Sequence, residues 1–267
     1  MNNRNSALVS FAALAVIAVA PLLPVPARAD DVPVAVAANF AGPMKEIAAT
    51  FAGATGHHAV VSTGATGALA AQVANGAPFE VFLAADATTP ARLEKDGLAV
   101  PGTRHAYALG RLVLWSAQEG AVDTAGAVLK SGDFAHLALA NPKLAPYGAA
   151  AVETLEKLGL RTALEPRFVL GENIGQAFQF VGSGNAELGF VALSQVWRDG
   201  RFTSGSGWIV PAALHAPLQQ DAVLLARGAD HAAARALLEF LHGEKAQAIM
   251  RSYGYEPAVE AVGAVAR

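Results

Sequence analysis

The hydrophobic pattern after Asp31 changes repeatedly between short apolar runs and longer segments with helical periodicity. The apolar runs predict buried strands: VPVAVAA (32–38), HHAVVSTG (57–64), FEVFLAA (79–85), RLVLWS (111–116), HLALANP (136–142), RFVLGEN (167–173), ELGFVAL (187–193) and AVLLARG (222–228). The segments between them predict helices, and DHAAARALLEFLHGEKAQAIMRSYG (230–254) predicts one long terminal helix. Apolar strands that alternate with helices favour an α/β fold, with parallel sheets covered by helices on both faces.

The first 29 residues have the pattern of a secretory signal peptide. Arg4 is the only charged residue among the first 27, and an apolar run (7–20) follows it. The end Ala27-Arg28-Ala29 fits the A-x-A rule, which predicts cleavage after Ala29. A membrane anchor is the disfavoured alternative, because the apolar run is short for a span and is followed by prolines. We therefore expect a periplasmic protein.

The composition excludes several kinds of site. The sequence has no cysteine, so disulfides, thiolate metal sites and lipid attachment through an N-terminal cysteine are excluded. The 19 Lys and Arg residues against 22 Asp and Glu residues give a net charge of −3, which does not indicate nucleic-acid binding. The chain that remains after cleavage is long enough for two lobes held by apolar cores alone.

Four predicted strand-to-helix corners are rich in small or neutral polar residues. They are AANF (37–40), STGATG (62–67), NPKLAPYG (141–148) and LGENIG (170–175). Ligands in open α/β sheets sit at the carboxyl ends of strands, and helix starts carry unpaired N–H groups that attract anions. Two corners lie early in the chain and two lie later, so two lobes facing each other across a cleft would bring all four together.

The candidate ligands at these corners are neutral donors: the side chains of Asn39, Thr66 and Tyr147, and the N–H of Ile174. Uncharged dipoles suit a small anion that is fully ionised at neutral pH, and they disfavour an oxyanion that carries a proton. The residues alone leave other interpretations open. Asn39 and Thr66 could cap the helices that follow them, and Tyr147 could be a surface aromatic that closes a loop.

Five blocks of sequence, taken in order, resemble the motifs of a known family. They are VAVAANF (34–40), STGATGALAAQVANGAPFEVFLAAD (62–86), ANPKLAPYGAAAVETLEKLG (140–159), GENIGQAFQFVGSGNAELGFVALSQV (171–196) and LLEFLHGEKAQAIMRSYGY (237–255). Together they resemble the molybdate-binding periplasmic proteins of ABC transporters, the ModA family, over nearly all of the chain after the signal peptide. The family's Asp and Ser in the second block are Glu80 and Ala84 here, and Asp86 is kept. Many members have a Tyr at the position of Ala192, whereas this chain has Tyr147 at the third corner, as in a second branch of the family.

The resemblance implies a type II periplasmic-binding-protein fold, in which two α/β lobes joined by a two-strand hinge close over an anion. It implies a first lobe of residues 30–107 and 219–267 and a second lobe of residues 108–218. The two crossovers are then expected near Ala106–Gly110 and His215–Gln220.

The resemblance also implies the ligand and its contacts. The oxyanion is expected to be molybdate or tungstate, bound by Ala38, Asn39, Thr66, Tyr147 and Ile174. No side chain is expected to be a direct ligand of the metal centre, and no cofactor is implied. The implied protein is a monomer that delivers its anion to the membrane permease of an ABC transporter.

Four alternatives are a binding protein for another anion such as sulfate, a binding protein for a carboxylate or amino acid, an exported enzyme and a cytoplasmic regulator of the same fold. A carboxylate or amino-acid site commonly uses an arginine clamp, and none of the four corners contains Arg. The G-x-S-x-G, H-E-x-x-H and P-loop patterns of common enzymes are absent from the sequence. His57 and His58 are adjacent on a predicted strand and would face opposite ways, and the other histidines are scattered and expected to be solvated. The predicted signal peptide disfavours a cytoplasmic regulator.

Overall fold

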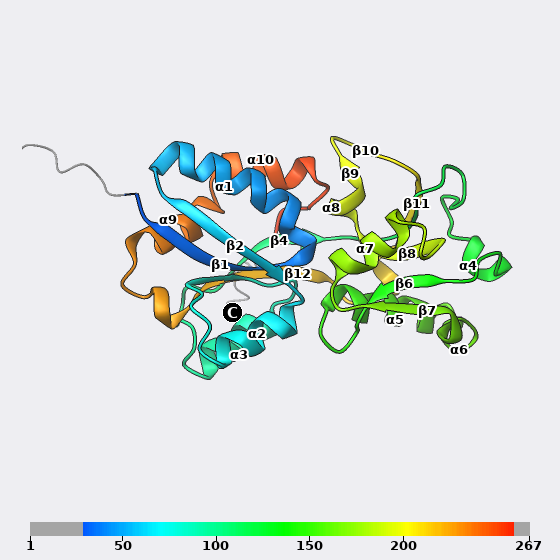
Figure 1. The fold of residues 1–267 in the computed structure, drawn as a ribbon, viewed down its shortest axis with the longest axis horizontal. Helices are drawn as coiled ribbons and strands as arrows, with labels where there is room; N and C mark the ends of the chain where they lie inside the picture. The colour runs from blue at the N-terminus through cyan, green and yellow to red at the C-terminus, as the bar shows by residue number, and fades with distance from the viewer. Residues whose placement is uncertain (1–28, 259–267) are drawn as a thin grey trace, which may run out of the picture.

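A computed structural model describes residues 29–258, which form two lobes, each built on one five-stranded sheet (Figure 1). The strand order is β2-β1-β3-β12-β4 in the first sheet and β11-β5-β8-β6-β7 in the second. This arrangement confirms the expected pair of α/β lobes. The predicted signal peptide, apart from Ala29, lies outside the described residues. No helix within residues 29–258 is both long and apolar enough to cross a membrane.

The first lobe combines the early part of the chain with its end. Its strands are β1 (Asp31–Ala37), β2 (His58–Gly64), β3 (Val81–Leu83), β4 (His105–Gly110) and β12 (Leu218–Leu224). Its helices are α1 (Ala41–Thr55), α2 (Thr66–Ala74), α3 (Thr88–Lys95), α9 (Ala232–Phe240) and α10 (Glu244–Ser252). A short 3-10 turn, η1 (Ala38–Phe40), joins β1 to α1.

The alternation of side chains along β1 explains why helices cover both faces of this sheet. Val32, Val34 and Val36 are fully buried and pack with residues of α1, α9 and α10. Ala35 points to the other face, where residues of α2 and α3 pack against it. The strand is therefore apolar on both sides, as its sequence predicts.

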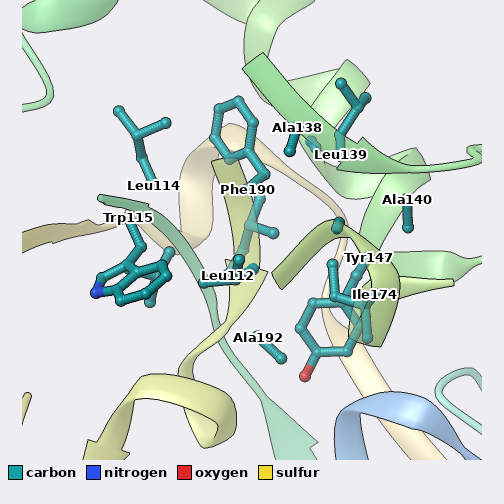
Figure 2. Close-up of a cluster of buried hydrophobic side chains, with 14 of the residues drawn as sticks. Leu112, Leu114, Trp115, Ala138, Leu139, Ala140, Tyr147, Ile174, Phe190 and Ala192 are labelled. Atoms are coloured by element: carbon teal, nitrogen blue, oxygen red, sulfur yellow. The ribbon is translucent and has the colours of Figure 1, made fainter. Parts of the chain in front are cut away.

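The second lobe has a single apolar core. Its strands are β5 (Leu112–Ser116), β6 (Leu137–Ala140), β7 (Phe168–Gly171), β8 (Leu188–Ala192) and β11 (Ser206–Ile209). Its helices are α4 (Val128–Ser131), α5 (Pro146–Lys157), α6 (Arg161–Leu164), α7 (Ile174–Gly182) and α8 (Leu193–Val196), and a hairpin of β9 (Trp197–Arg198) and β10 (Arg201–Phe202) follows. Figure 2 shows that Tyr147 and Ile174 lie at the edge of this core, with the Tyr147 hydroxyl directed away from Leu114 and Phe190.

The chain passes between the two lobes where β4 continues into β5 and where β11 leads into β12. The expected lobe limits at 107/108 and 218/219 fall inside β4 and β12, and both of these strands pair in the first sheet. An isolated bridge between Leu109 and Glu256 brings the end of the described chain to the same region.

The sheets are mixed rather than parallel, which corrects the prediction. β12 runs antiparallel to both β3 and β4, and β5 runs antiparallel to β8 and β11. β5 and β12 are the strands that the chain enters directly from the other lobe, so no crossover helix sets their direction. β2 is an edge strand with alternating exposure, and Val60 on it is 50% exposed.

The predicted single terminal helix is wrong, because the chain forms α9 and α10 with a break between them. His242 N–H donates to Glu239 O, and Gly243 N–H donates to Phe240 O, which closes a tight turn. In one continuous helix, Leu237 and Ala246 would point about 180° apart. The break lets both residues be fully buried in the same core.

Candidate functional site

A small cavity lies between the lobes. The first lobe lines it with Ala37, Ala38, Asn39, Gly64, Ala65, Thr66 and Ala85, and the second lobe with Ala145, Pro146, Tyr147 and Ile174. These residues include every one of the predicted ligands, and they come from all four predicted corners. None of the described residues that line the cavity is charged.

The four corners are all helix starts. Within residues 29–258, no side chain caps η1, α2 or α5. At α7 the Asn173 side chain accepts from the N–H groups of Gly175 and Gln176, so the N–H of Ile174 is outside this cap. N–H groups that have no partner within their own helix, and the positive ends of the helix dipoles, therefore lie at the cavity.

The alternative interpretations of the predicted ligands do not fit the structure. Neither Asn39 nor Thr66 is a side-chain cap, since the positions before the helices are held by Ala37, Phe40 and Ala65. Tyr147 is only 1% exposed, so it is not a surface aromatic.

Thr66 is held as a donor. Its Oγ1 accepts a hydrogen bond from the N–H of Ala85 at 3.0 Å, which leaves the hydroxyl proton to be donated. The side chain is 1% exposed and lines the cavity. A ligand at this position would therefore meet a fixed hydroxyl donor.

Tyr147 is arranged in a similar way. Its hydroxyl oxygen accepts from Gln220 Nε2 at 3.1 Å. Complete burial raises the pKa of Tyr147 well above its usual value, and the nearby phenols of Tyr255 and Tyr107 add to this rise. The phenol is therefore neutral and keeps its proton at physiological pH.

The Asn39 side chain, which the sequence predicts to be a donor to the anion, donates to other protein groups in this structure. Its Nδ2 donates to Gln220 Oε1 at 2.8 Å and to the Tyr255 hydroxyl at 2.9 Å. Its backbone oxygen accepts from Ser194 Oγ at 2.7 Å and from the Tyr255 hydroxyl at 3.0 Å. In this structure the Asn39 amide binds other parts of the protein, and the residue faces the cavity as part of an uncapped helix start.

The lobes are in direct contact around the cavity. The N–H of Gly67 in α2 donates to Leu144 O in the second lobe at 2.9 Å. Arg198 in β9 donates to both carboxylate oxygens of Glu46 in α1, at 2.7 and 2.9 Å. The structure therefore has the lobes closed on the site.

Sequence reasoning missed a second layer of polar residues behind the cavity. Gln220, Tyr107 and Tyr255 are each at most 4% exposed, and Ser194 is 7% exposed. The one available signal was a run of three polar residues, Gln219, Gln220 and Asp221, at the entry to an apolar strand. Among the described residues, no group of three or more His, Cys, Asp or Glu is placed to hold a metal ion.

Comparison with known proteins shows what family this arrangement belongs to. The sequence family described as "Bacterial extracellular solute-binding protein" matches residues 32–256. The molybdate-binding protein ModA of Azotobacter vinelandii is 57% identical over 92% of this chain and 98% of its own. The ModA of Rhodobacter capsulatus is 50% identical over 87% of this chain and 91% of its own. The chain belongs to the ModA family of bacterial solute-binding proteins.

The solved structure of the Azotobacter vinelandii periplasmic molybdate-binding protein matches this ModA-family chain with a TM-score of 0.82 and 42% identity. The match covers 84% of this chain and 98% of that one. The fold is therefore the type II periplasmic-binding-protein fold that the sequence predicts. The relatives are named as binding proteins, so the chain is a solute-binding protein and not an enzyme.

Proposed function

We propose that this protein captures molybdate, or tungstate, in the periplasm and delivers it to the membrane permease of an ABC transporter. The proposal assumes that the signal peptide is removed after Ala29 and that the protein acts as a monomer. The observation that carries the proposal is the uncharged cavity between the lobes, to which all four predicted corners contribute. The names of its close relatives support the same ligand.

The proposed contacts follow from which donors remain available. Thr66 and Tyr147 each have an oxygen occupied by a protein N–H, so each can donate its hydroxyl proton to an oxyanion. We assign the N–H groups of Ala38 and Ile174 to the same ligand, since both residues line the cavity at helix starts. Asn39 completes the proposed set at the first corner. No acceptor is assigned, and this favours an anion without a proton.

The proposed cycle uses the hinge. The cavity is enclosed by both lobes, so the anion enters while the lobes are apart, and its contacts with both lobes favour closure. We propose that the lobes divide near residues 107/108 and 218/219, at β4 and β12, and that the closed form is what the permease recognises.

Isothermal titration with molybdate, tungstate and sulfate tests the ligand. We expect molybdate and tungstate to bind and sulfate, which is smaller, to bind more weakly. In a parallel thermal scan, either metal oxyanion at one hundred times its Kd should add about 2.7 kcal/mol to the free energy of unfolding. Binding of sulfate alone would replace the proposal with a sulfate-binding protein, and binding of an amino acid alone would remove the oxyanion site altogether.

A further inference from the structure

Gln220 occupies a central place behind the cavity. It lies on β12, the strand that enters the first sheet from the second lobe, and its side chain has no exposed surface. Its Oε1 accepts from Asn39 Nδ2 at 2.8 Å and from the Tyr107 hydroxyl at 2.9 Å. Its Nε2 donates to the Tyr147 hydroxyl at 3.1 Å. One amide therefore links proposed ligand residues of both lobes through the hinge.

The direction of these bonds matters for the ligand. Gln220 has one acceptor end and one donor end, and Asn39 and Tyr107 occupy the acceptor end. The donor end is thereby turned to Tyr147, whose oxygen can only accept from it. With its oxygen accepting in this way, the phenol can donate its proton to a ligand in the cavity.

We infer that Gln220 is a positioning residue for oxyanion binding: it fixes the Tyr147 hydroxyl as a donor to the ligand and couples it to Asn39 in the opposite lobe. This inference rests on the proposed function, because it assigns Gln220 a role in the same site. It adds a specificity element on the hinge strand, outside the residues that touch the anion.

The backbone beside Gln220 leaves room for this arrangement. Gly110, the last residue of β4, lies against the Tyr147 hydroxyl and Gln220 Nε2, and a Cβ at this position would collide with both atoms. The backbone angle of Gly110 is not in the left-handed region, so the glycine is needed here for space. The first crossover strand is thus shaped around the Tyr147–Gln220 hydrogen bond.

Gln220→Glu keeps the shape of the side chain but reverses the direction of its hydrogen bond with Tyr147. In its ionised form the new carboxylate still accepts from Asn39 and Tyr107, but it cannot donate to Tyr147, so the phenol turns its proton toward the carboxylate. Binding should then weaken for two reasons: the loss of the phenol donor and the repulsion between the new charge and the anion. The repulsion is also present when Tyr147 is Phe, so a double-mutant cycle separates the two effects.

The test is molybdate titration of the parent protein, Gln220→Glu, Tyr147→Phe and the double variant. We expect Tyr147→Phe alone to weaken binding about tenfold, and Gln220→Glu to weaken it more. The double variant should bind about as well as Gln220→Glu alone, which is a coupling of about tenfold. If the fold losses in affinity of the two single variants multiply to the loss of the double variant, to within about twofold, the inference is overturned while the proposed function stands. A parent protein that binds no oxyanion would overturn both.

A second cycle, with Gln220→Met, adds no charge and guards against a variant that fails to fold. Gln220→Met should also weaken binding less in the Tyr147→Phe protein than in the parent. Gln247→Met is the matched control, since Gln247 on α10 donates to Tyr107 O, Leu241 O and the Met250 sulfur and is not among the residues that line the cavity. We expect it to leave the affinity unchanged. An equal loss from Gln220→Met in both backgrounds would contradict the positioning role.

Discussion

At the scale of single residues, two of the proposed ligands, Thr66 and Tyr147, are donors because their hydroxyl oxygens already accept a hydrogen bond from a protein N–H. The oxygen of Thr66 is occupied by the N–H of Ala85, and the oxygen of Tyr147 is occupied by Gln220. Each hydroxyl therefore offers its proton, which is the part that an oxyanion needs. Asn39 is different, because its amide protons go to Gln220 and Tyr255.

Thr66→Val removes this hydroxyl and keeps the shape of the side chain. We expect molybdate binding to weaken by about 1.5–3 kcal/mol, the range for a hydrogen bond to a charged group. Thr154→Val is the matched control: Thr154 is also buried, but its hydroxyl donates to Ala150 O within α5. Titration calorimetry of both variants gives the comparison. Equal affinities for the two variants would show that Thr66 does not contact the anion.

Asn39→Ala should lower the stability of the ligand-free protein as well as its affinity. The substitution removes the Asn39 Nδ2 hydrogen bond to the buried Gln220 Oε1. It also removes the Asn39 Nδ2 hydrogen bond to the Tyr255 hydroxyl. We expect a loss of about 1–3 kcal/mol in the free energy of unfolding, measured by urea denaturation without ligand. A variant that binds weakly but unfolds like the parent would indicate that the Asn39 side chain acts only on the ligand.

At the scale of elements, the site was predictable because it is made from local patterns. A strand that ends in Ala-Asn or Ser-Thr-Gly and leads into a helix can be recognised in the sequence, and AANF and STGATG did become cavity walls. Gln220 could not be found in this way, because it is 181 positions from Asn39 and 73 from Tyr147. The break between α9 and α10 could not be predicted, because it depends on the packing of Ala246 into the core of the first lobe.

The expectation that the scattered histidines are solvated fails for His215 and His105, because burial depends on neighbours that are distant in sequence, whereas His136 and His242 are exposed. His215 is only 7% exposed, and His105 in β4 stacks on His242, which follows α9, with ring centroids 3.8 Å apart. His105 Nε2 is buried without a hydrogen-bond partner among the described residues. Burial, followed by the neighbouring His242, lowers the pKa of His105 from 6.5 to about 4, while Thr103 O and Asp221 oppose the shift.

This pair should make the protein sensitive to acid. Because the pKa of His105 is about 4 in the folded protein and 6.5 in the unfolded chain, the unfolded chain takes up the proton first on acidification. The stability that depends on neutral His105 is fully present above pH 6.5 and is lost as the pH falls toward 4. His105→Phe should reduce the dependence of the melting temperature on pH over this window. His58→Asn, at an exposed position, should leave that dependence unchanged. An unchanged slope in His105→Phe would contradict this assignment.

At the scale of the whole molecule, the closed arrangement has more than one contact between the lobes. Gly67 and Leu144 share a backbone hydrogen bond, and Arg198 lies over the Tyr253 ring while it pairs with Glu46. The hydrogen bond from Arg198 is the main cause that lowers the pKa of Glu46, so this ion pair is fully formed at neutral pH. These contacts form between the lobes only when they close.

Arg198→Met should therefore weaken molybdate binding without touching the site. The two side chains are 36% and 39% exposed, so we expect a modest loss of about 0.2–1 kcal/mol, or at most about fivefold in Kd. Arg161→Met is the control, because Arg161 pairs with Glu156 and Glu165 within the second lobe. Titration of both variants makes the comparison. A larger loss in Arg161→Met than in Arg198→Met would show that the interlobe pair does not favour closure.

The most direct measurement of the central claim is a crystal structure of the protein grown with molybdate, with the molybdenum located by its anomalous scattering. We predict one strong peak in the cavity between the lobes, with oxyanion oxygens bonded to the hydroxyls of Thr66 and Tyr147 and to backbone N–H groups of both lobes. No Lys or Arg side chain should touch the anion. A peak outside this cavity, or an anion neutralised there by a Lys or Arg, would contradict the account.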